Sequence, residues 1–290
     1  MQYSVLSRVF IARGRNIDLT MKVSRIISTA VLTLACVAGM AQTKVVAHRG
    51  YWQTEGSAQN SIAALEGAKN LGCWGSEFDV WITTDGVCVV NHDATTGGMV
   101  IEESAYADLK NVTLKNGEHM PTLEEYLGRG SHLAPMELIL EIKSHKSKDR
   151  ENKCVDEVLR LVKKYGVVNN TSYISFSLNV CRQLIAKGPS ALDGPNGQRS
   201  GKKVDKVNLQ VAYLNGDLSP EEVKAEGFTG IDYEQDVLNK HPEWVEKCHE
   251  LSLTVNVWTV NSLDAAWKFI ASGVDFITTD RPVECLKLCK

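Results

Sequence analysis

Three carboxylate residues fall on or at the ends of predicted β-strands. Glu77 and Asp79 lie two positions apart and share one face of a strand, because strand side chains alternate between faces. Glu141 ends a later predicted strand. Carboxylate oxygens are hard ligands that suit Mg2+ or Ca2+ rather than a metal that seeks thiolates. The three residues therefore form a candidate metal site.

Two histidines and two cationic residues accompany these carboxylates. His48 and Arg49 follow the first predicted strand, His92 follows the third, and Lys143 shares a strand face with Glu141. Three carboxylates and one divalent ion carry a net charge of -1, the two cations bring it to +1, and a phosphodiester anion brings it to zero. Histidine titrates near neutrality and suits general acid and base catalysis. The set indicates phosphoryl chemistry.

Each of these residues alone has an ordinary structural interpretation. A histidine at a strand end is often only a hydrogen-bonded structural residue, Arg49 could be a surface cation, and Glu141 and Lys143 could form only a salt bridge. Their convergence is more informative, because barrel enzymes carry their active sites at the carboxyl ends of the strands. Carboxylates inside a barrel are also costly unless they are paired or bind a metal.

Predicted strands and helices alternate along residues 42–290. The predicted strands are Val45–Ala47, Phe78–Ile82, Val87–Val90, Leu138–Leu140, Tyr173–Phe176, Leu209–Ala212, Gly230–Asp232, Val255–Trp258 and Phe276–Ile277. The predicted helices cover residues 60–71, 151–165, 178–187, 220–225, 242–251 and 262–272, with a further helix at the C-terminus. This order predicts a parallel sheet and, at this length, a single-domain α/β (β/α)8 TIM barrel.

Nine predicted strands compete for eight places in such a barrel. Asp85-Gly86 is a hairpin signal, so one member of the strand pair around it is expected to be an antiparallel appendage. The segment Ala94–Pro121 breaks the alternation and is predicted to be a small insertion after the third strand. Pro189–Lys206 is rich in Gly, Ser and Lys and is predicted to be a mobile loop.

The N-terminus has the layout of a secretory signal peptide. Met21 opens a segment with two basic residues, an apolar stretch follows, and small residues precede a predicted cleavage site after Ala41. Residues 1–20 then form an upstream extension, and Met21 is a candidate true start. A lipoprotein signal ending at Cys36 is the alternative, although Thr33 replaces the usual Leu. We expect an exported, periplasmic or secreted protein without stable membrane insertion after cleavage.

Composition limits the partners and the cysteine chemistry. The formal net charge of -3 argues against a nucleic-acid partner, which would favour a basic domain. Seven cysteines follow the predicted signal, and their spacing does not match a zinc site. Cys88 and Cys181 lie in apolar patterns and are predicted to be core residues. Disulfide pairing is left open.

An ordered series of motifs resembles the glycerophosphodiester phosphodiesterase family across residues 44–283. These motifs are His48-Arg49-Gly50, Glu77-Phe78-Asp79-Val80, Thr84-Asp85-Gly86, His92-Asp93, Pro121-Thr122-Leu123-Glu124-Glu125, Glu141-Ile142-Lys143, Trp258-Thr259-Val260-Asn261 and Gly273-Val274-Asp275-Phe276-Ile277-Thr278-Thr279-Asp280. The resemblance implies a barrel fold, a divalent cation, and hydrolysis of small-molecule glycerophosphodiesters to glycerol 3-phosphate and an alcohol. In the family, a neighbouring glycerol hydroxyl is thought to attack phosphorus and give a cyclic intermediate.

The resemblance also implies a role for each candidate residue. His48 and His92 would act as general base and acid, and Arg49 and Lys143 would bind the phosphate. The metal ligands would be Glu77, Asp79 and Glu141. Trp258 is predicted to form a wall of the substrate pocket, although a Trp on a barrel strand is often only a core residue. Asp280 has an ordinary structural interpretation as well, because it could be no more than a helix cap.

The chain departs from the family at one motif, where Ala58-Gln59-Asn60 replaces the usual Pro-Glu-Asn. Gln59 carries no charge, so metal affinity or substrate choice is expected to differ. Two other functions remain open. One is a related phosphodiesterase that acts on lysophospholipids or phosphoinositides, and the other is a catalytically impaired binding protein on the same barrel.

Overall fold

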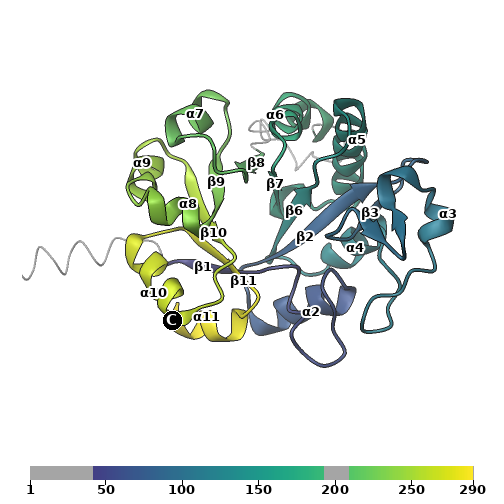
Figure 1. Cartoon of the computed structure of the whole chain (residues 1–290), viewed down its shortest axis with the longest axis horizontal. Helices are drawn as coiled ribbons and strands as arrows, with labels where there is room; N and C mark the ends of the chain where they lie inside the picture. Colours follow the sequence, from purple (N-terminus) through teal and green to yellow (C-terminus); the bar gives the residue numbers. More distant parts are fainter. Residues whose placement is uncertain (1–41, 193–208, 290) are drawn as a thin grey trace, which may run out of the picture. The chain divides into compact units, whose positions relative to one another are not determined.

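The computed structural model describes residues 42–192 and 209–289. Eight parallel strands form a closed ring with helices on its outside (Figure 1). In chain order the ring strands are β1 (Lys44–Ala47), β2 (Gly75–Ile82), β6 (Glu137–Ile142), β7 (Thr171–Ser175), β8 (Gln210–Tyr213), β9 (Gly230–Glu234), β10 (Thr254–Trp258) and β11 (Phe276–Thr279). Because β1 pairs with both β11 and β2, the ring closes, and the predicted (β/α)8 barrel is confirmed.

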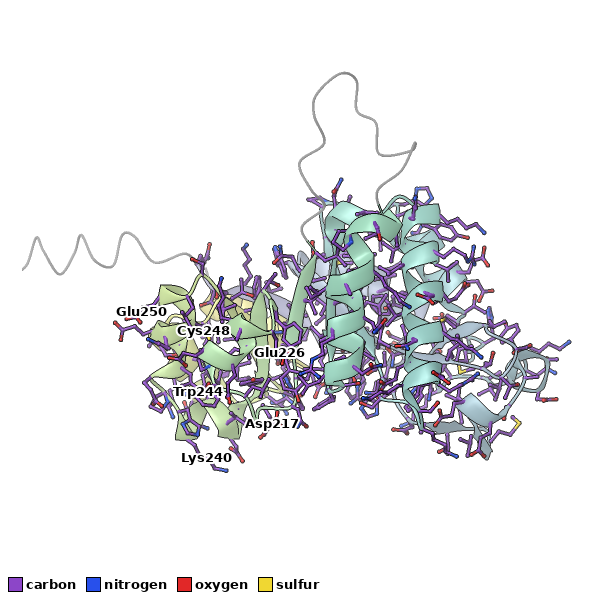
Figure 2. All side chains as sticks on the ribbon, turned by 90° about the horizontal axis from the view of Figure 1, so that it is seen from above. Asp217, Glu226, Lys240, Trp244, Cys248 and Glu250 are labelled. Atoms are coloured by element: carbon purple, nitrogen blue, oxygen red, sulfur yellow. The ribbon has the colours of Figure 1, made fainter. Side chains whose placement is uncertain are left out.

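The helices form the outer layer of the barrel. They are α2 (Ile62–Leu71), α4 (Leu123–Gly130), α5 (Lys148–Lys164), α6 (Leu178–Leu192), α7 (Pro220–Ala225), α8 (Gln235–Lys240), α9 (Trp244–Glu250), α10 (Leu263–Ser272) and α11 (Pro282–Leu288). Helices α5 and α6 run side by side, and the labels of Trp244 and Cys248 mark α9 on the other side of the view (Figure 2). Ser or Thr caps several helices by accepting a backbone N–H, as Ser147 does at α5.

A ninth strand, β3 (Cys88–Val90), lies outside the ring and pairs antiparallel with β2. The predicted antiparallel appendage is therefore confirmed. His92 follows this strand, so it reaches the barrel from an antiparallel strand and not from a parallel strand of the ring. Strand β2 extends to Ile82, and the chain turns at Gly86 and runs back along β2, so that Val90 pairs with Val80. The segment after β3 thereby returns to the level of Asp79, whose carbonyl accepts the N–H of Asn91.

The insertion after β3 is also present. It contains a two-stranded sheet of β4 (Thr95–Thr96) and β5 (Met99–Val100), the 3-10 helix η1 (Ile101–Glu103) and the short helix α3 (Tyr106–Leu109). It has a hydrophobic cluster of its own, which includes Trp81, Ile101 and Met120. Glu118 near its end accepts the backbone N–H groups of Ile62 and Ala63, so the insertion is anchored to the start of α2.

Some predicted boundaries differ from the structure. Helices α4 and α8 were not predicted. The prediction of a loop over Pro189–Lys206 is wrong at its start, because α6 continues through Pro189 to Leu192. The side chain of Leu192 is buried in the main core. The rest of that loop, the signal segment and residues 1–20 lie outside the described residues.

The described cysteines are free, and Cys88 and Cys181 are buried in the main core, as predicted. Among the described residues, no helix is both long and apolar enough to cross a membrane.

Candidate active site

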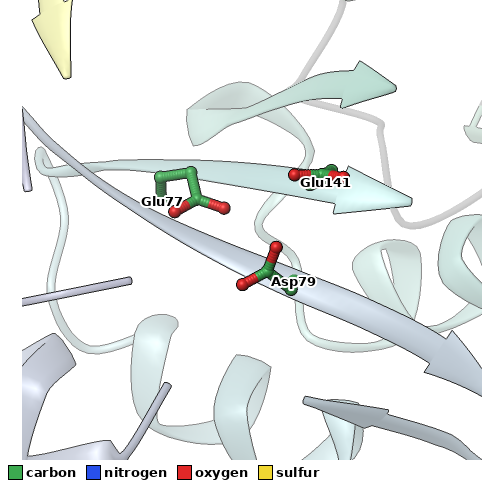
Figure 3. Close-up of side chains that lie close together, drawn as sticks. All are labelled: Glu77, Asp79 and Glu141. Carbon is green, nitrogen blue, oxygen red and sulfur yellow. The ribbon is translucent and has the colours of Figure 1, made fainter. Parts of the chain in front are cut away.

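Three carboxylates meet inside the barrel near the carboxyl ends of β2 and β6 (Figure 3). Glu77 and Asp79 project from the same face of β2, and Asp79 is the register partner of Glu141 on β6. One oxygen atom from each carboxylate lies within 4.8 Å of the others. All three side chains are buried. The sequence prediction that these carboxylates share one place in the fold therefore matches the geometry.

The protonation of this cluster is shifted by burial and by mutual repulsion. Burial, followed by repulsion from Asp79 and Glu141, holds the pKa of Glu77 well above its usual range. Burial and the charge of Asp79 raise the pKa of Glu141 to about 8. For Asp79, burial opposes ionisation, but Lys143, His92, Asn60 and Arg49 outweigh it and lower the pKa to about 2. Two of the three carboxylates therefore resist ionisation unless further positive charge is present.

The donor set fits a divalent cation. Within the described part of the chain, Glu77 Oε1 is buried without a hydrogen-bond partner. A buried, unpartnered carboxylate oxygen is costly, and a hard cation would satisfy it. The three carboxylates supply only oxygen ligands, which suits Mg2+ or Ca2+.

Lys143 and Arg49 flank the carboxylates. Lys143 Nζ lies 3.0 Å from Asp79 Oδ1 and 2.8 Å from Glu141 Oε1. Arg49 Nε lies 3.8 Å from Asp79 Oδ2, and the Arg49 backbone N–H donates to Glu77 Oε2 at 2.8 Å. Burial lowers the pKa of Lys143, but the charges of Asp79 and Glu141 outweigh it and raise this pKa, so the Lys143 side chain remains cationic.

The turn after β1 is built so that Arg49 can reach the cluster. Arg49 has a φ of 55° and Gly50 a φ of 77°. A Cβ on residue 50 would lie 2.6 Å from the Ala64 side chain, so glycine is required by space as well as by conformation. This close packing against α2 places the Arg49 N–H against Glu77.

Gln59 and Asn60 hold the site from the same loop. Gln59 Oε1 accepts a hydrogen bond from Arg49 Nη1 at 2.9 Å. Asn60 Nδ2 donates to Asp79 Oδ2 at 2.8 Å, and Asn60 Oδ1 accepts the Asp79 N–H at 3.3 Å. Asn60 was given no role from the sequence, although it lies in the motif in which Gln59 departs from the family pattern.

His48, at the end of β1, is held by Asp280. Its Nδ1 lies 2.8 Å from Asp280 Oδ1, and Asp280 also accepts hydrogen bonds from Trp52 Nε1 and Asn261 Nδ2. Burial alone would raise the pKa of Asp280, but these donors, led by His48, lower it. Asp280 is not a helix cap, because the N-cap of α11 is Arg281.

His92 reaches the same pocket from the segment after β3. Its Nδ1 lies 2.8 Å from Asp93 Oδ1, and its backbone carbonyl accepts a hydrogen bond from Trp81 Nε1 at 3.2 Å. Burial lowers the pKa of His92, although Asp79 opposes the shift. The lowered pKa favours the neutral form of the imidazole.

These side chains line one pocket of about 110 Å³. Seven of the eight predicted site residues contribute to its wall: His48, Arg49, Glu77, His92, Glu141, Lys143 and Trp258. The eighth, Asp79, is buried and contacts Lys143. The lining also includes the apolar side chains of Phe176, Leu214 and Trp258. The pocket thus combines a charged wall suited to an anion with an apolar wall.

Comparison with known proteins agrees with this geometry. Residues 48–284 match the model of the glycerophosphoryl diester phosphodiesterase family. A glycerophosphodiester phosphodiesterase of Caldanaerobacter subterraneus is 24% identical over 266 residues, which cover 86% of this chain and 98% of that protein.

Solved structures show the same barrel. A glycerophosphodiester phosphodiesterase from Parabacteroides distasonis is 45% identical, with a TM-score of 0.79 over 87% of this chain and 98% of that one. A phosphodiesterase from Oleispira antarctica, solved in complex with the product sn-glycerol-3-phosphate, is 21% identical, with a TM-score of 0.68 over 87% of this chain and 97% of that one. The match over most of the barrel shows that this chain belongs to the glycerophosphoryl diester phosphodiesterase family.

Proposed function

We propose that this protein hydrolyses glycerophosphodiesters to glycerol 3-phosphate and an alcohol, with a divalent cation and two histidines. One observation carries the proposal: a single pocket contains three buried carboxylates, two cationic side chains and two histidines, each hydrogen-bonded to a carboxylate. The names of the relatives, and the product bound in the Oleispira antarctica structure, support the same substrate class.

The cation would be held by Glu77, Asp79 and Glu141, and we propose Mg2+ or Ca2+ because all the ligands are oxygen atoms. When bound, the ion would supply Lewis-acid stabilisation of the charge that develops on the phosphoryl oxygens. The pKa values of Glu77 and Glu141 are raised, which is consistent with carboxylates that need a bound cation to be ionised.

Arg49 and Lys143 bind the phosphate in this proposal. Each already contacts Asp79, so both side chains are oriented before substrate arrives. Their charges balance the excess negative charge that the substrate brings, and they stabilise the more highly charged transition state.

His48 and His92 act as general base and general acid. The Asp280 carboxylate accepts the Nδ1 hydrogen of His48, which leaves Nε2 able to take the proton of an attacking hydroxyl group. His92 has the same relationship to Asp93 and, when protonated, can give a proton to the oxygen of the leaving alcohol. The two carboxylates stabilise the imidazolium forms and fix the ring orientations.

A substrate panel tests this proposal. Purified protein is incubated with glycerophosphodiesters, lysophospholipids and phosphoinositides, with added Mg2+ or Ca2+ or with excess chelator. We expect glycerol 3-phosphate from the first class only when metal is present. Preferred turnover of another class would replace the substrate assignment, and binding without turnover of any substrate would favour the impaired binding protein.

We also propose that the protein is exported. The support is the sequence layout between Met21 and Ala41 described above. N-terminal sequencing of protein recovered from the native host should identify Gln42 as the first residue. Retention of residues before Gln42 would contradict cleavage at this position, and an N-terminal lipid on Cys36 would favour the lipoprotein alternative.

A further inference from the structure

One buried carboxylate in the active-site pocket has no part in the proposed catalysis. Asp232 lies on β9, it is among the residues that line the pocket, and only 2% of the residue is exposed. Its Oδ1 atom has no hydrogen-bond partner among residues 42–192 and 209–289. An unpartnered buried carboxylate oxygen is costly, so its retention calls for a ligand or another source of compensation.

The residues beside Asp232 leave this oxygen unsatisfied. Its register partner on β10 is Asn256, whose Nδ2 donates to Thr278 Oγ1 at 2.9 Å. Burial raises the pKa of Asp232 to about 7, although a hydrogen bond from Asn256 lowers it. No Lys or Arg of the described chain forms an ion pair with it. The ionised carboxylate therefore lacks a cationic partner within the protein.

Two aromatic side chains complete this part of the wall. Trp258 Nε1 donates to the backbone carbonyl of Asp232 at 2.9 Å, which fixes the indole beside β9. The Phe176 ring meets the Trp258 ring edge to face, with centroids 5.7 Å apart. A carboxylate next to aromatic rings is a suitable environment for a small organic cation, which gains both charge attraction and cation–π interaction.

The net charge of the pocket with metal and substrate bound also favours a cationic group beside Asp232. The three metal-binding carboxylates, one divalent ion, Arg49, Lys143 and a phosphodiester anion sum to zero. Ionised Asp232 would add one uncompensated negative charge, which a positively charged group on the substrate would neutralise. The unpartnered Oδ1 also calls for a hydrogen-bond donor, and a protonated primary amine supplies both charge and donor.

We propose that Asp232 selects glycerophosphodiesters whose alcohol carries a protonated primary amine. The amine donates to Asp232 Oδ1, and its carbon stem packs against Trp258 and Phe176. This specificity role rests on the proposed function and deepens it. Asp232 also lines a second cavity of about 330 Å³, which shares Ile174 with the first, so a role confined to that cavity is the alternative that the experiment must exclude.

The test compares two substrates that differ in one group. Glycerophosphoethanolamine carries the amine, and glycerophospho-ethylene glycol carries a neutral hydroxyl in its place. Because a charge-assisted hydrogen bond is stronger than a neutral one, we expect wild-type kcat/KM to favour the amine by at least ~10-fold. Asp232→Asn should reduce this preference to within about threefold, mainly through loss of activity on the amine substrate. Asp236→Asn, an exposed residue at the start of α8, is the control and should retain the preference.

The possible results distinguish a failure of the specificity role from a failure of the proposed function. Equal rates on the two substrates in wild type, or an equal loss on both in Asp232→Asn, would overturn the specificity role while leaving the proposed function intact. Turnover of glycerophosphocholine as fast as glycerophosphoethanolamine would overturn the requirement for an N–H donor. No turnover of any of these substrates by wild type would overturn the proposed function, and the specificity role with it. The wild-type comparison decides the matter even where the Asp232 variant does not fold.

Discussion

His48 Nδ1 lies 2.8 Å from Asp280 Oδ1, although the two residues are 232 positions apart in the chain. They meet because β1 and β11 are neighbours in the closed barrel, with Ala47 paired to Thr279. Asp280 is itself held by Trp52 and Asn261. Closure of the barrel therefore orients the proposed general base.

Asp280→Asn should lower kcat by about 100-fold, with little change in KM, because the amide cannot stabilise the imidazolium form of His48 as a carboxylate does. Steady-state kinetics, with thermal unfolding to confirm the fold, measure this effect. Asp264→Asn, at an exposed position in α10, is the control. Unchanged kcat in Asp280→Asn would show that the hydrogen bond has no catalytic role.

His48→Ala and His92→Ala should each reduce turnover by at least ~100-fold, as expected on losing a general acid or base. The double variant should lose much less than the product of the two effects, because the histidines act as one unit. His132→Ala, at an exposed residue that is not among those lining the pocket, is the control. Near-wild-type rates in one single variant would remove that histidine from the mechanism.

Metal-free protein should become less stable as the pH rises from about 4.3, the usual pKa of Glu, to about 8, the pKa of Glu141. A carboxyl group whose pKa is raised in the folded state stabilises the fold below its unfolded pKa, and this stabilisation is lost as the pH rises through the folded pKa. The pKa of Glu77 is raised as well, and that of Asp79 is lowered to about 2, which places its opposite effect below this window.

Glu77→Gln should therefore flatten the pH dependence and raise the thermal midpoint in chelator at pH 8. Added Mg2+ or Ca2+ should raise the midpoint of wild type more than that of the variant. Thermal unfolding across pH 5 to 8 measures both effects, and Glu246→Gln on the exposed face of α9 is the control. Identical pH profiles in wild type and Glu77→Gln would refute the electrostatic account of the cluster.

Gln59→Glu should weaken substrate binding more than it alters metal affinity. Gln59 contacts Arg49 rather than the carboxylates, so a glutamate there would pair with the Arg49 guanidinium and offset its charge. We expect KM to rise by about threefold to tenfold, and the metal concentration for half activation to fall by less. Titrations of substrate and metal against activity separate the two. A lower metal concentration for half activation, without any change in KM, would instead show that the added glutamate charge acts on the bound cation and not on Arg49.

The strand patterns predicted the carboxylate cluster well, because alternation along a strand is local. Glu77 and Asp79 had to share a face, and the barrel then brought Glu141 beside Asp79. The position of His92 depends on the direction of the strand before it, which the sequence left open. A short apolar run does not reveal whether its strand is parallel or antiparallel, and β3 pairs antiparallel with β2 outside the ring.

Long-range contacts could not be predicted in this way. The bonds from Asn60 to Asp79 and from His48 to Asp280 depend on loop conformation and on barrel closure, which single-strand patterns do not contain. Asp232 lies in a predicted strand, but its unpartnered oxygen becomes evident only when the neighbouring strands are placed. Pro189 gave a misleading signal, because packing of Leu192 in the core outweighs the usual tendency of proline to end a helix.

The most direct test of the account is the release of glycerol 3-phosphate from glycerophosphoethanolamine by purified protein before chelation, in excess chelator, and after metal is restored. The account predicts turnover that disappears in chelator and returns with Mg2+ or Ca2+. It also predicts that Glu77→Gln remains folded but inactive at metal concentrations that saturate wild type, since the carboxylate charge is what the cation needs. Full turnover by wild type in excess chelator, with no metal left in the protein, would contradict it.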